Sequence, residues 1–223
     1  MLELLYTHDD FLIINKPPGL AVQGGKGVRY SLIDIIAHEY HCKIWLAHRL
    51  DQETSGCILV ARSPRSASQL AQLINSHTVQ KTYTALVAGQ FPATCNTIDT
   101  PLTIQGKKVP ARTLIAKVIN IDEYSVLVCT LDTGRLHQIR RHCANIGFPI
   151  IGDEKYGNFT VNKKFSKLHG TKALFLHSWK LQLLSPYNIE VTAPFPEHFA
   201  NFFKLIKEQN PKGTRELEKE AML

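Results

Sequence analysis

A polar loop between two apolar runs is the feature that most constrains this 223-residue chain. The runs at residues 44–47 and 57–61 are typical of buried β-strands. The nine residues between them, 48–56, carry a guanidinium, two carboxylates and two hydroxyl groups. A simple turn would need only glycine, asparagine, aspartate or proline. The loop is therefore either an ordinary solvated connection or a functional site held between two strands.

A second polar cluster occupies residues 133–142. The pattern predicts a helix from about residue 134 to residue 146, because Thr133 or Asp132 can cap its start and Gly147 can end it. Four side chains are expected to share the apolar face of this helix: Leu136, Ile139, Cys143 and Ile146.

Basic side chains are expected to be neighbours on this helix because they lie three and four positions apart: His137, Arg140 and Arg141. Positive groups in the first half of a helix oppose its dipole. This placement is unfavourable unless an anion, either a phosphate or a carboxylate, lies nearby. An Asp51 carboxylate facing Arg140 would stay ionised, with its pKa lowered. We therefore predict that Asp51 and Arg140 form a pair.

Four segments in this order resemble the motifs of the RluA-type pseudouridine synthases, the isomerases that convert uridine in RNA to pseudouridine. The matching segments are residues 15–20 (NKPPGL), 48–56 (HRLDQETSG), 81–89 (KTYTALVAG) and 134–142 (GRLHQIRRH), the last followed by 149–157 (PIIGDEKYG). The chain departs from the usual pattern at two positions. Leu136 stands where threonine is usual, and Gln23 stands where histidine is common.

The resemblance implies a role for each of four residues. Asp51 would be the nucleophile or base, and Arg140 would keep it ionised and oriented. Tyr83 would stack against the uracil, with its hydroxyl placed to help remove the ring proton. Arg49 would enter the RNA stack in place of the extruded nucleotide. The reaction involves no net redox change and consumes no water, so no cofactor is expected.

The resemblance also implies an α+β fold: one catalytic domain with a long mixed sheet, flanking helices and an active-site cleft across its middle. The sequence pattern agrees, since successive strands without helical crossovers predict a largely antiparallel sheet. Strands are expected at 11–15, 82–87, 112–119, 124–131, 173–184 and 189–192, and helices from Ser31, at 64–75 and at 196–208. We expect a single catalytic domain at 1–210, a charged and disordered tail at 211–223, and no N-terminal accessory RNA-binding domain.

The charge balance favours a phosphate-bearing partner. Lysine and arginine total 26 against 19 aspartates and glutamates, which gives a net charge of +7. The positive charge is concentrated locally at 107–112 and 163–172, although each could be a solvated loop. The residues expected to contact RNA are Arg49, Arg135, His137, Lys163 and Lys164. A stem-loop of transfer RNA or large-subunit ribosomal RNA is the expected target, because specific RNA recognition favours bases that can splay outward.

Two other function classes remain open. A nucleoside- or glycoside-cleaving enzyme usually needs two carboxylates flanking the bond, and Glu53 is the only acidic neighbour of Asp51 in the loop. Such an enzyme would release free uracil. A non-catalytic RNA-binding relative is the other alternative, and the intact set of Asp51, Tyr83 and Arg140 speaks against it.

Several site types are not expected. The five cysteines are odd in number and lack Cys-x-x-Cys spacing, which favours reduced thiols in a cytoplasmic protein. No run approaches the roughly 20 apolar residues of a membrane helix. His137 and His142 would diverge on a helix, so a shared metal ion is not expected. We therefore expect a monomer with no metal, no cofactor and no membrane partner.

Overall fold

The computed structural model describes residues 1–209, so the predicted tail at 211–223 lies outside the described residues. The chain divides into two compact units. Unit 1 consists of residues 1–81 and 177–194, and unit 2 consists of residues 82–176 and those from Phe195 onward. Each unit therefore combines two separated stretches of sequence. The prediction of a single catalytic domain over residues 1–210 stays a prediction.

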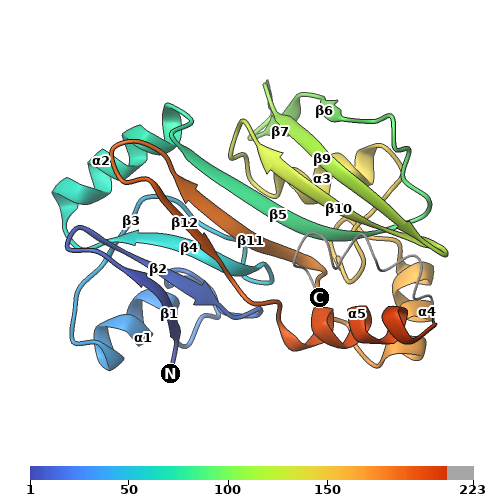
Figure 1. The fold of residues 1–223 in the computed structure, drawn as a ribbon, viewed down its shortest axis with the longest axis horizontal. Helices are drawn as coiled ribbons and strands as arrows, with labels where there is room; N and C mark the ends of the chain where they lie inside the picture. Colours follow the sequence, from blue (N-terminus) through green and yellow to red (C-terminus); the bar gives the residue numbers. More distant parts are fainter. Residues whose placement is uncertain (210–223) are drawn as a thin grey trace. The chain divides into compact units, whose positions relative to one another are not determined.

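Unit 1 is built on a mixed sheet (Figure 1). Its strands are β1 (Glu3–Thr7), β2 (Phe11–Lys16), β3 (Trp45–Leu46), β4 (Ser55–Ala61), β11 (Leu176–Leu183) and β12 (Ile189–Thr192). The first three neighbours, β1, β2 and β4, pair antiparallel, whereas β4 and β11 pair parallel. Strand β12 pairs antiparallel with β11, and β3 with β4. Every residue of β4 is buried, which explains its continuous apolar run.

Two helices of unit 1 begin at capping boxes. Helix α1 (Leu32–Glu39) starts after Ser31, whose side chain accepts from the backbone of Asp34 while the Asp34 carboxylate accepts from Ser31 in return. Helix α2 (Pro64–Asn75) starts after Ser63 with proline in the first turn. The core beside α2 contains Phe11, Ile13, Leu59, Leu70 and Leu181. Leu73 and Ile74 pack against this core.

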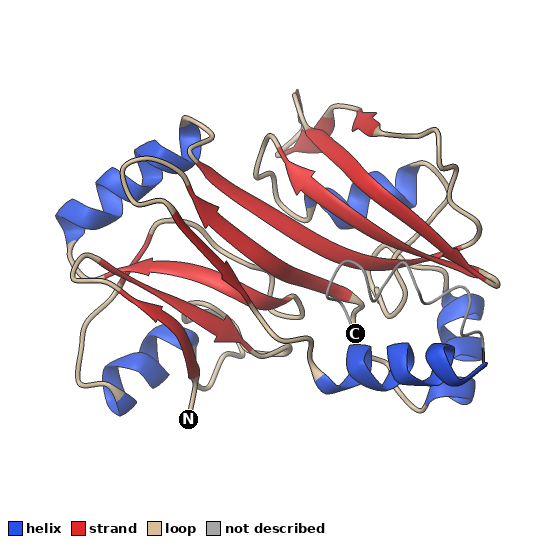
Figure 2. Ribbon diagram, in the orientation of Figure 1, coloured by secondary structure: helices blue, strands red, loops and turns tan. Residues whose placement is uncertain are grey.

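Unit 2 is built on an antiparallel sheet (Figure 2). Strands β9 and β10 pair along most of their length. Its strands are β5 (Val79–Ala88, which begins in unit 1), β6 (Thr97–Asp99), β7 (Leu102–Ile104), β8 (Lys107–Val109), β9 (Arg112–Ile121) and β10 (Tyr124–Leu131). The ladder order is β5-β10-β9-β6, and β7 and β8 form a separate hairpin. Its helices are α3 (Gln138–Asn145), α4 (Phe159–His169) and α5 (Glu197–Gln209).

An aromatic cluster joins the two C-terminal helices of unit 2. The rings of Phe165 on α4 and Phe202 on α5 have centroids 5.7 Å apart, and Phe175 lies within 5.8 Å of both. All three side chains are buried. Aromatic pairs at these separations pack favourably beyond the area that they bury. This cluster therefore fixes α4 against α5.

The predicted α+β class with a mixed, mostly antiparallel sheet is confirmed. The helix predicted from residue 134 is wrong at its start, because His137 adopts a left-handed backbone conformation (φ 53°) and α3 begins at Gln138. Leu136 consequently precedes the helix and is exposed rather than part of its apolar face. The basic stretch at 163–172 is not a simple loop, since α4 covers most of it.

Candidate active site

Asp51 lies in the loop between β3 and β4, in unit 1. Its side chain is partly exposed, whereas Leu50 before it and Thr54 after it are buried. The backbone N–H of Thr54 donates to the carbonyl oxygen of Asp51 at 3.2 Å and closes a turn. Anchors on both sides thus hold the carboxylate at the surface of a well-packed loop.

Lys16 is a buried cation that ties this loop to the turn after β2. Its Nζ donates to the carbonyl oxygens of Pro17 and Leu20, both at 2.9 Å, and of Gln52 at 2.8 Å. The side chain is fully buried, and this burial lowers the pKa of Lys16 to about 7, against the opposing charges of Glu53 and Asp51. Lys16 lies in the first of the four motif segments, and the sequence alone indicates no role for it. Its three bonds fix the backbone next to Asp51.

His48 anchors the other end of the loop in its neutral form. Its Nε2 accepts a hydrogen bond from the backbone N–H of Leu59 at 3.1 Å. Burial, with the nearby charge of Lys81, lowers the pKa of His48 to about 3. Because the ring accepts through Nε2, the proton of the neutral imidazole sits on Nδ1. His48 therefore joins the loop to the middle of β4 without carrying charge.

The loop ends where β4 meets β11 in parallel. Ser55 Oγ lies 2.8 Å from His177 Nδ1, and the opposite ring nitrogen lies 3.3 Å from the carbonyl oxygen of Ala193. Since a carbonyl can only accept, the ring proton is on Nε2 and the Ser55 hydroxyl donates to Nδ1. Gly56 has φ +102°, and a Cβ there would stand 2.2 Å from the Ser178 carbonyl oxygen. Only glycine fits this junction.

Arg140 lies on α3 of unit 2 and is held by Asp153. Its Nε donates to Asp153 Oδ2 at 2.8 Å and its Nη2 to Oδ1 at 2.9 Å. Both side chains are buried. Oδ1 also accepts from the backbone N–H groups of Lys155 and Tyr156, each at 2.9 Å. Burial alone would raise the pKa of Asp153, but the bonds from Arg140 and Tyr156 outweigh it and hold that pKa below its usual value.

The Asp153 carboxylate is the anion that was expected near the basic first turn of the helix. Arg140 occupies the first turn of α3, where a lone cation would be unfavourable, and the Asp153 carboxylate compensates it. The sequence analysis did not foresee Asp153 as a partner of Arg140. Asp51 belongs to unit 1 and Arg140 to unit 2, so the predicted pair of Asp51 and Arg140 stays a prediction.

Two tyrosines of unit 2, Tyr83 and Tyr156, lie within the segments that resemble the family motifs. Tyr83 lies on β5 opposite Cys129 of β10 and is buried, 6% exposed. Tyr156 is partly exposed, and the Arg140 guanidinium carbon lies 5.4 Å from its ring centroid. Its hydroxyl lies 3.1 Å from His137 Nδ1. Tyr156 was not singled out from the sequence, although it falls in the segment that follows the arginine motif.

The residues predicted to contact RNA differ in how they are held. Arg49 is exposed. Arg135 is also exposed and donates from Nε to the carbonyl oxygen of Pro110 at 3.2 Å. Lys163 is exposed on α4, whereas its neighbour Lys164 pairs with both carboxylate oxygens of Glu123 at 2.8 Å.

Within residues 1–209, no group of three or more histidine, cysteine, aspartate or glutamate side chains is arranged to hold a metal ion. Over the same described residues, no helix combines the length and the apolar character needed to cross a membrane.

Comparison with known proteins identifies the family. The family described as RNA pseudouridylate synthase matches residues 10–145. The chain is 32% identical over 209 residues to the ribosomal large subunit pseudouridine synthase C of Vibrio cholerae, which covers 87% of this chain and 66% of that protein. It is 34% identical over 222 residues to the uncharacterized RNA pseudouridine synthase YhcT of Bacillus subtilis, covering 90% and 70%. The chain thus spans about two thirds of the length of these relatives.

A solved structure supports the fold. The human RNA pseudouridylate synthase domain containing 4 superposes with a TM-score of 0.73 at 24% identity, covering 92% of each chain. This likeness agrees with the α+β fold and the mixed sheet described above. The resemblance seen in four ordered motifs is confirmed at the level of the whole family. This chain belongs to the RNA pseudouridylate synthase family, the enzymes that isomerise uridine in RNA to pseudouridine.

Proposed function

We propose that this chain converts a specific uridine to pseudouridine in a stem-loop of large-subunit ribosomal RNA. The proposed target is supported by its relatives, several of which are ribosomal large subunit pseudouridine synthases. A stem-loop suits the reaction, because its unstacked bases can leave the helix at low energetic cost. Transfer RNA is the second candidate substrate.

Asp51 is the proposed catalytic carboxylate. The observation that supports it best is the way its loop is held: Lys16, His48 and the turn to Thr54 fix the backbone on both sides of a partly exposed side chain. Such anchoring keeps a reacting group in one geometry, which is worth several orders of magnitude in rate. The charges of Glu53 and Asp51 in turn favour the ammonium form of the buried Lys16.

Three chemical routes remain open for Asp51. The carboxylate can attack the sugar, attack the base, or remove a proton from the sugar. In each route the glycosidic carbon–nitrogen bond breaks, the uracil turns, and a carbon–carbon bond to the ribose forms before the ring carbon loses its proton. All atoms of the substrate are retained, so the protein needs only to bind, orient and move protons.

Arg140, Tyr83 and Arg49 are the proposed supporting residues. Arg140 would orient the reacting carboxylate, and its bidentate contact with Asp153 restricts the guanidinium to one orientation. Tyr83 would stack on the uracil and assist proton removal from its ring. Arg49 is exposed in the Asp51 loop, as a residue that replaces an extruded base must be. Arg135, His137, Lys163 and Lys164 are proposed to contact the RNA backbone.

The test is isomerisation by the purified chain, measured with a tritium-release assay on uridine labelled at the ring carbon. Substrates are a set of large-subunit ribosomal RNA stem-loops and a pool of transfer RNA. We expect turnover on one ribosomal stem-loop. Turnover on transfer RNA alone would reassign the target, and free uracil among the products would favour glycosidic cleavage. RNA binding without turnover on any substrate would favour the non-catalytic alternative.

A further inference from the structure

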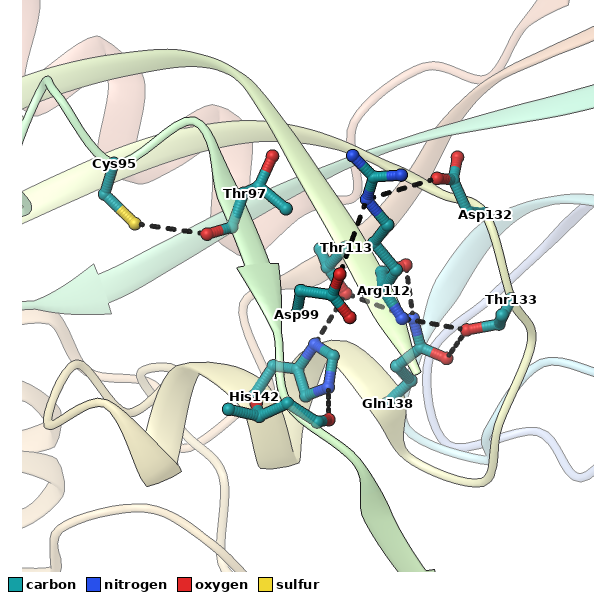
Figure 3. Close-up of polar contacts among 10 residues, drawn as sticks. Cys95, Thr97, Asp99, Arg112, Thr113, Asp132, Thr133, Gln138 and His142 are labelled. Atoms are coloured by element: carbon teal, nitrogen blue, oxygen red, sulfur yellow. Dashed lines mark hydrogen bonds and ion pairs between the residues drawn. The ribbon is translucent and has the colours of Figure 1, made fainter. Parts of the chain in front are cut away.

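Gln138, the first residue of α3, lies at the centre of a hydrogen-bonded network in unit 2 (Figure 3). It is buried, 3% exposed. Its Oε1 accepts from the Thr133 hydroxyl at 2.6 Å and from the backbone N–H of Arg135 at 3.1 Å. Its Nε2 donates to the carbonyl oxygen of Arg112 at 2.9 Å and to Thr113 Oγ1 at 3.1 Å. All four hydrogen-bonding positions of the amide are thus used.

The direction of each bond in this network follows from its fixed ends. The carbonyl of Arg112 can only accept and the backbone N–H of Arg135 can only donate, so the amide of Gln138 has one possible orientation. His142 Nε2 lies 3.0 Å from the Thr100 carbonyl oxygen and must therefore carry the ring proton. The Thr113 hydroxyl, 2.9 Å from His142 Nδ1, then donates to the ring and accepts from Gln138.

In this bonding pattern the histidine at the far end of the network is neutral. Burial lowers the pKa of His142, although the bond to Thr100 opposes this effect. The ring is fully buried, so its two bonds satisfy both nitrogens. Thr133 completes the other end, since its hydroxyl oxygen also accepts from the backbone N–H of Arg112 at 3.1 Å. The start of β9 is therefore tied to the turn before α3.

This arrangement fixes two residues of the proposed site together. The Gln138 side chain accepts a hydrogen bond from the backbone N–H of Arg135, in the turn before α3. Arg140 lies two positions after Gln138, in the first turn of the helix. The left-handed His137 prevents the helix from extending backward and fixing this turn by helical bonds. One backbone bond, from the Gln138 N–H to the Arg135 carbonyl oxygen at 3.0 Å, closes this turn, and the side chain of Gln138 adds the bonds that tie the turn to β9. Fully satisfied buried amides rigidify their surroundings, whereas partly satisfied ones are destabilising.

We propose that Gln138 is a positioning residue for the isomerisation, one that sets the direction of Arg140 and the RNA-facing turn at Arg135 through the bonds of its amide. The inference rests on the proposed function for the roles of those two arginines. No contact between Gln138 and the substrate is required. A displacement of about 1 Å at a catalytic group can reduce turnover by about 100-fold, so loss of these bonds should reduce the rate more than the RNA affinity.

The first test is Gln138→Glu, with Gln105→Glu at an exposed position of unit 2 as the matched control for charge. The introduced carboxylate keeps the two acceptor bonds but turns an oxygen toward the Arg112 carbonyl and Thr113. We expect the single-turnover rate constant to fall about 10- to 100-fold at neutral pH, with RNA affinity changed less than about threefold. Gln105→Glu should behave as wild type.

The pH profile separates positioning from a general loss of structure. Burial should raise the pKa of the introduced carboxyl above its usual value of about 4.3, and its protonated form regains one donor. The rate of Gln138→Glu relative to wild type should therefore recover as the pH falls. A rate within twofold of wild type at neutral pH, or a loss that acid does not reverse, would overturn the inference.

A second pair of variants covers the case in which Gln138→Glu fails to fold. Thr133→Val removes the hydroxyl that donates to Gln138, and Thr133→Ser restores it. We expect the valine variant to slow the single-turnover step and the serine variant to recover most of the rate. Equal rates for the two variants would contradict the inference.

Amide exchange distinguishes this inference from the proposed function. Gln138→Met should expose the Arg135 amide to exchange, because that N–H loses its acceptor. If wild type forms no pseudouridine in any RNA, the proposed function fails, and the exchange measurement still decides whether Gln138 fixes the turn. Unchanged protection of the Arg135 amide would then overturn the inference.

Discussion

The two regions that carry the proposed catalytic residues are held by opposite electrostatic means. The Asp51 loop of unit 1 is anchored by two bases, the fully buried Lys16 and the half-buried His48, whose pKa values are both lowered. The Arg140 region of unit 2 is anchored by an ion pair in which Asp153 stays charged. The first region therefore holds its backbone through hydrogen bonds to a buried ammonium and to a neutral imidazole. The second holds a side chain through complementary charge.

Because the two regions are held differently, loss of an anchoring side chain should have a different consequence in each. Lys16 and His48 bond to backbone atoms, so their loss should release a loop. Asp153 bonds to a side chain and to the turn that contains Tyr156, so its loss should remove two of the hydrogen bonds that orient a buried guanidinium. Substitutions in both regions test this difference.

The largest effect is expected at Asp51. Asp51→Asn should lower the single-turnover rate by at least about 1,000-fold, because a neutral amide can neither attack nor accept a proton. The protein should remain folded and bind RNA with near wild-type affinity. The neighbouring exposed Glu53→Gln is the control and should keep most activity. Activity of Asp51→Asn within tenfold of wild type would end the assignment.

The next effect is expected at Arg140. Arg140→Ala should lower turnover by several orders of magnitude, and Arg140→Lys should lose most of it as well. A lysine retains the charge but cannot reproduce the two-pronged contact with a carboxylate. Single-turnover kinetics on the best ribosomal stem-loop measure both variants. A lysine variant with wild-type kinetics would show that only charge is needed, as for a phosphate contact.

Asp153→Asn should have its main effect on stability. The substitution removes the negative charge that accepts two hydrogen bonds from the buried Arg140 guanidinium, which should reduce the free energy of unfolding by about 3 kcal/mol. Urea denaturation gives this value. Asp99→Asn is the matched control, because Asp99 faces Arg112 at the surface with both side chains exposed. Similar losses for the two variants would show that the buried pair has no special weight.

The sequence predicted the strands and helices of both regions better than the side-chain contacts that hold the proposed catalytic residues. Strands at Tyr124–Leu131 and Ile189–Thr192 and the helix at Pro64–Asn75 have the predicted limits. Alternation and capping signals are local, so a single sequence reveals them. Asp153 lies 13 residues from Arg140 and outside the helix, and no local rule brings the two together.

Two further features were missed for identifiable reasons. Helix α4 buries only Phe165, so it lacks the repeated apolar positions that reveal an amphipathic helix. The start of α3 was placed too early because Thr133 is a good capping residue by type. Its hydroxyl instead donates to the Gln138 side chain, and the left-handed His137 sets the helix boundary.

A pH-dependent stability loss is expected from His48. Its pKa falls from 6.5 to about 3 on folding, so below pH 6.5 the unfolded chain binds a proton that the folded protein does not. Stability contributed by the neutral ring is present above pH 6.5 and is lost as the pH falls toward 3. His48→Gln keeps an acceptor for Leu59 without titrating. Urea denaturation from neutral to acidic pH should show a shallower slope for this variant. Parallel slopes would contradict the assignment.

The smallest effect separates two adjacent lysines on α4. Lys163→Ala should reduce the salt dependence of RNA binding by about one unit of slope, because a free cation releases a counterion on binding phosphate. Lys164→Ala should change it less, since Glu123 already compensates that charge. Affinities measured over a range of potassium chloride concentrations give both slopes. A larger effect at Lys164 would mean that RNA displaces Glu123.

The contact between Ser55 and His177 joins residues 122 positions apart, and the parallel pairing of β4 with β11 depends on the same distant segment. A ribosome adds roughly 5 to 20 residues per second, so the 122 residues between Ser55 and His177 take about 6 to 24 seconds to synthesise. During that time β4 has an unpaired edge of buried apolar residues. We therefore expect the nascent chain to need protection from aggregation until β11 has emerged, long after Asp51, the proposed catalytic carboxylate, has been made.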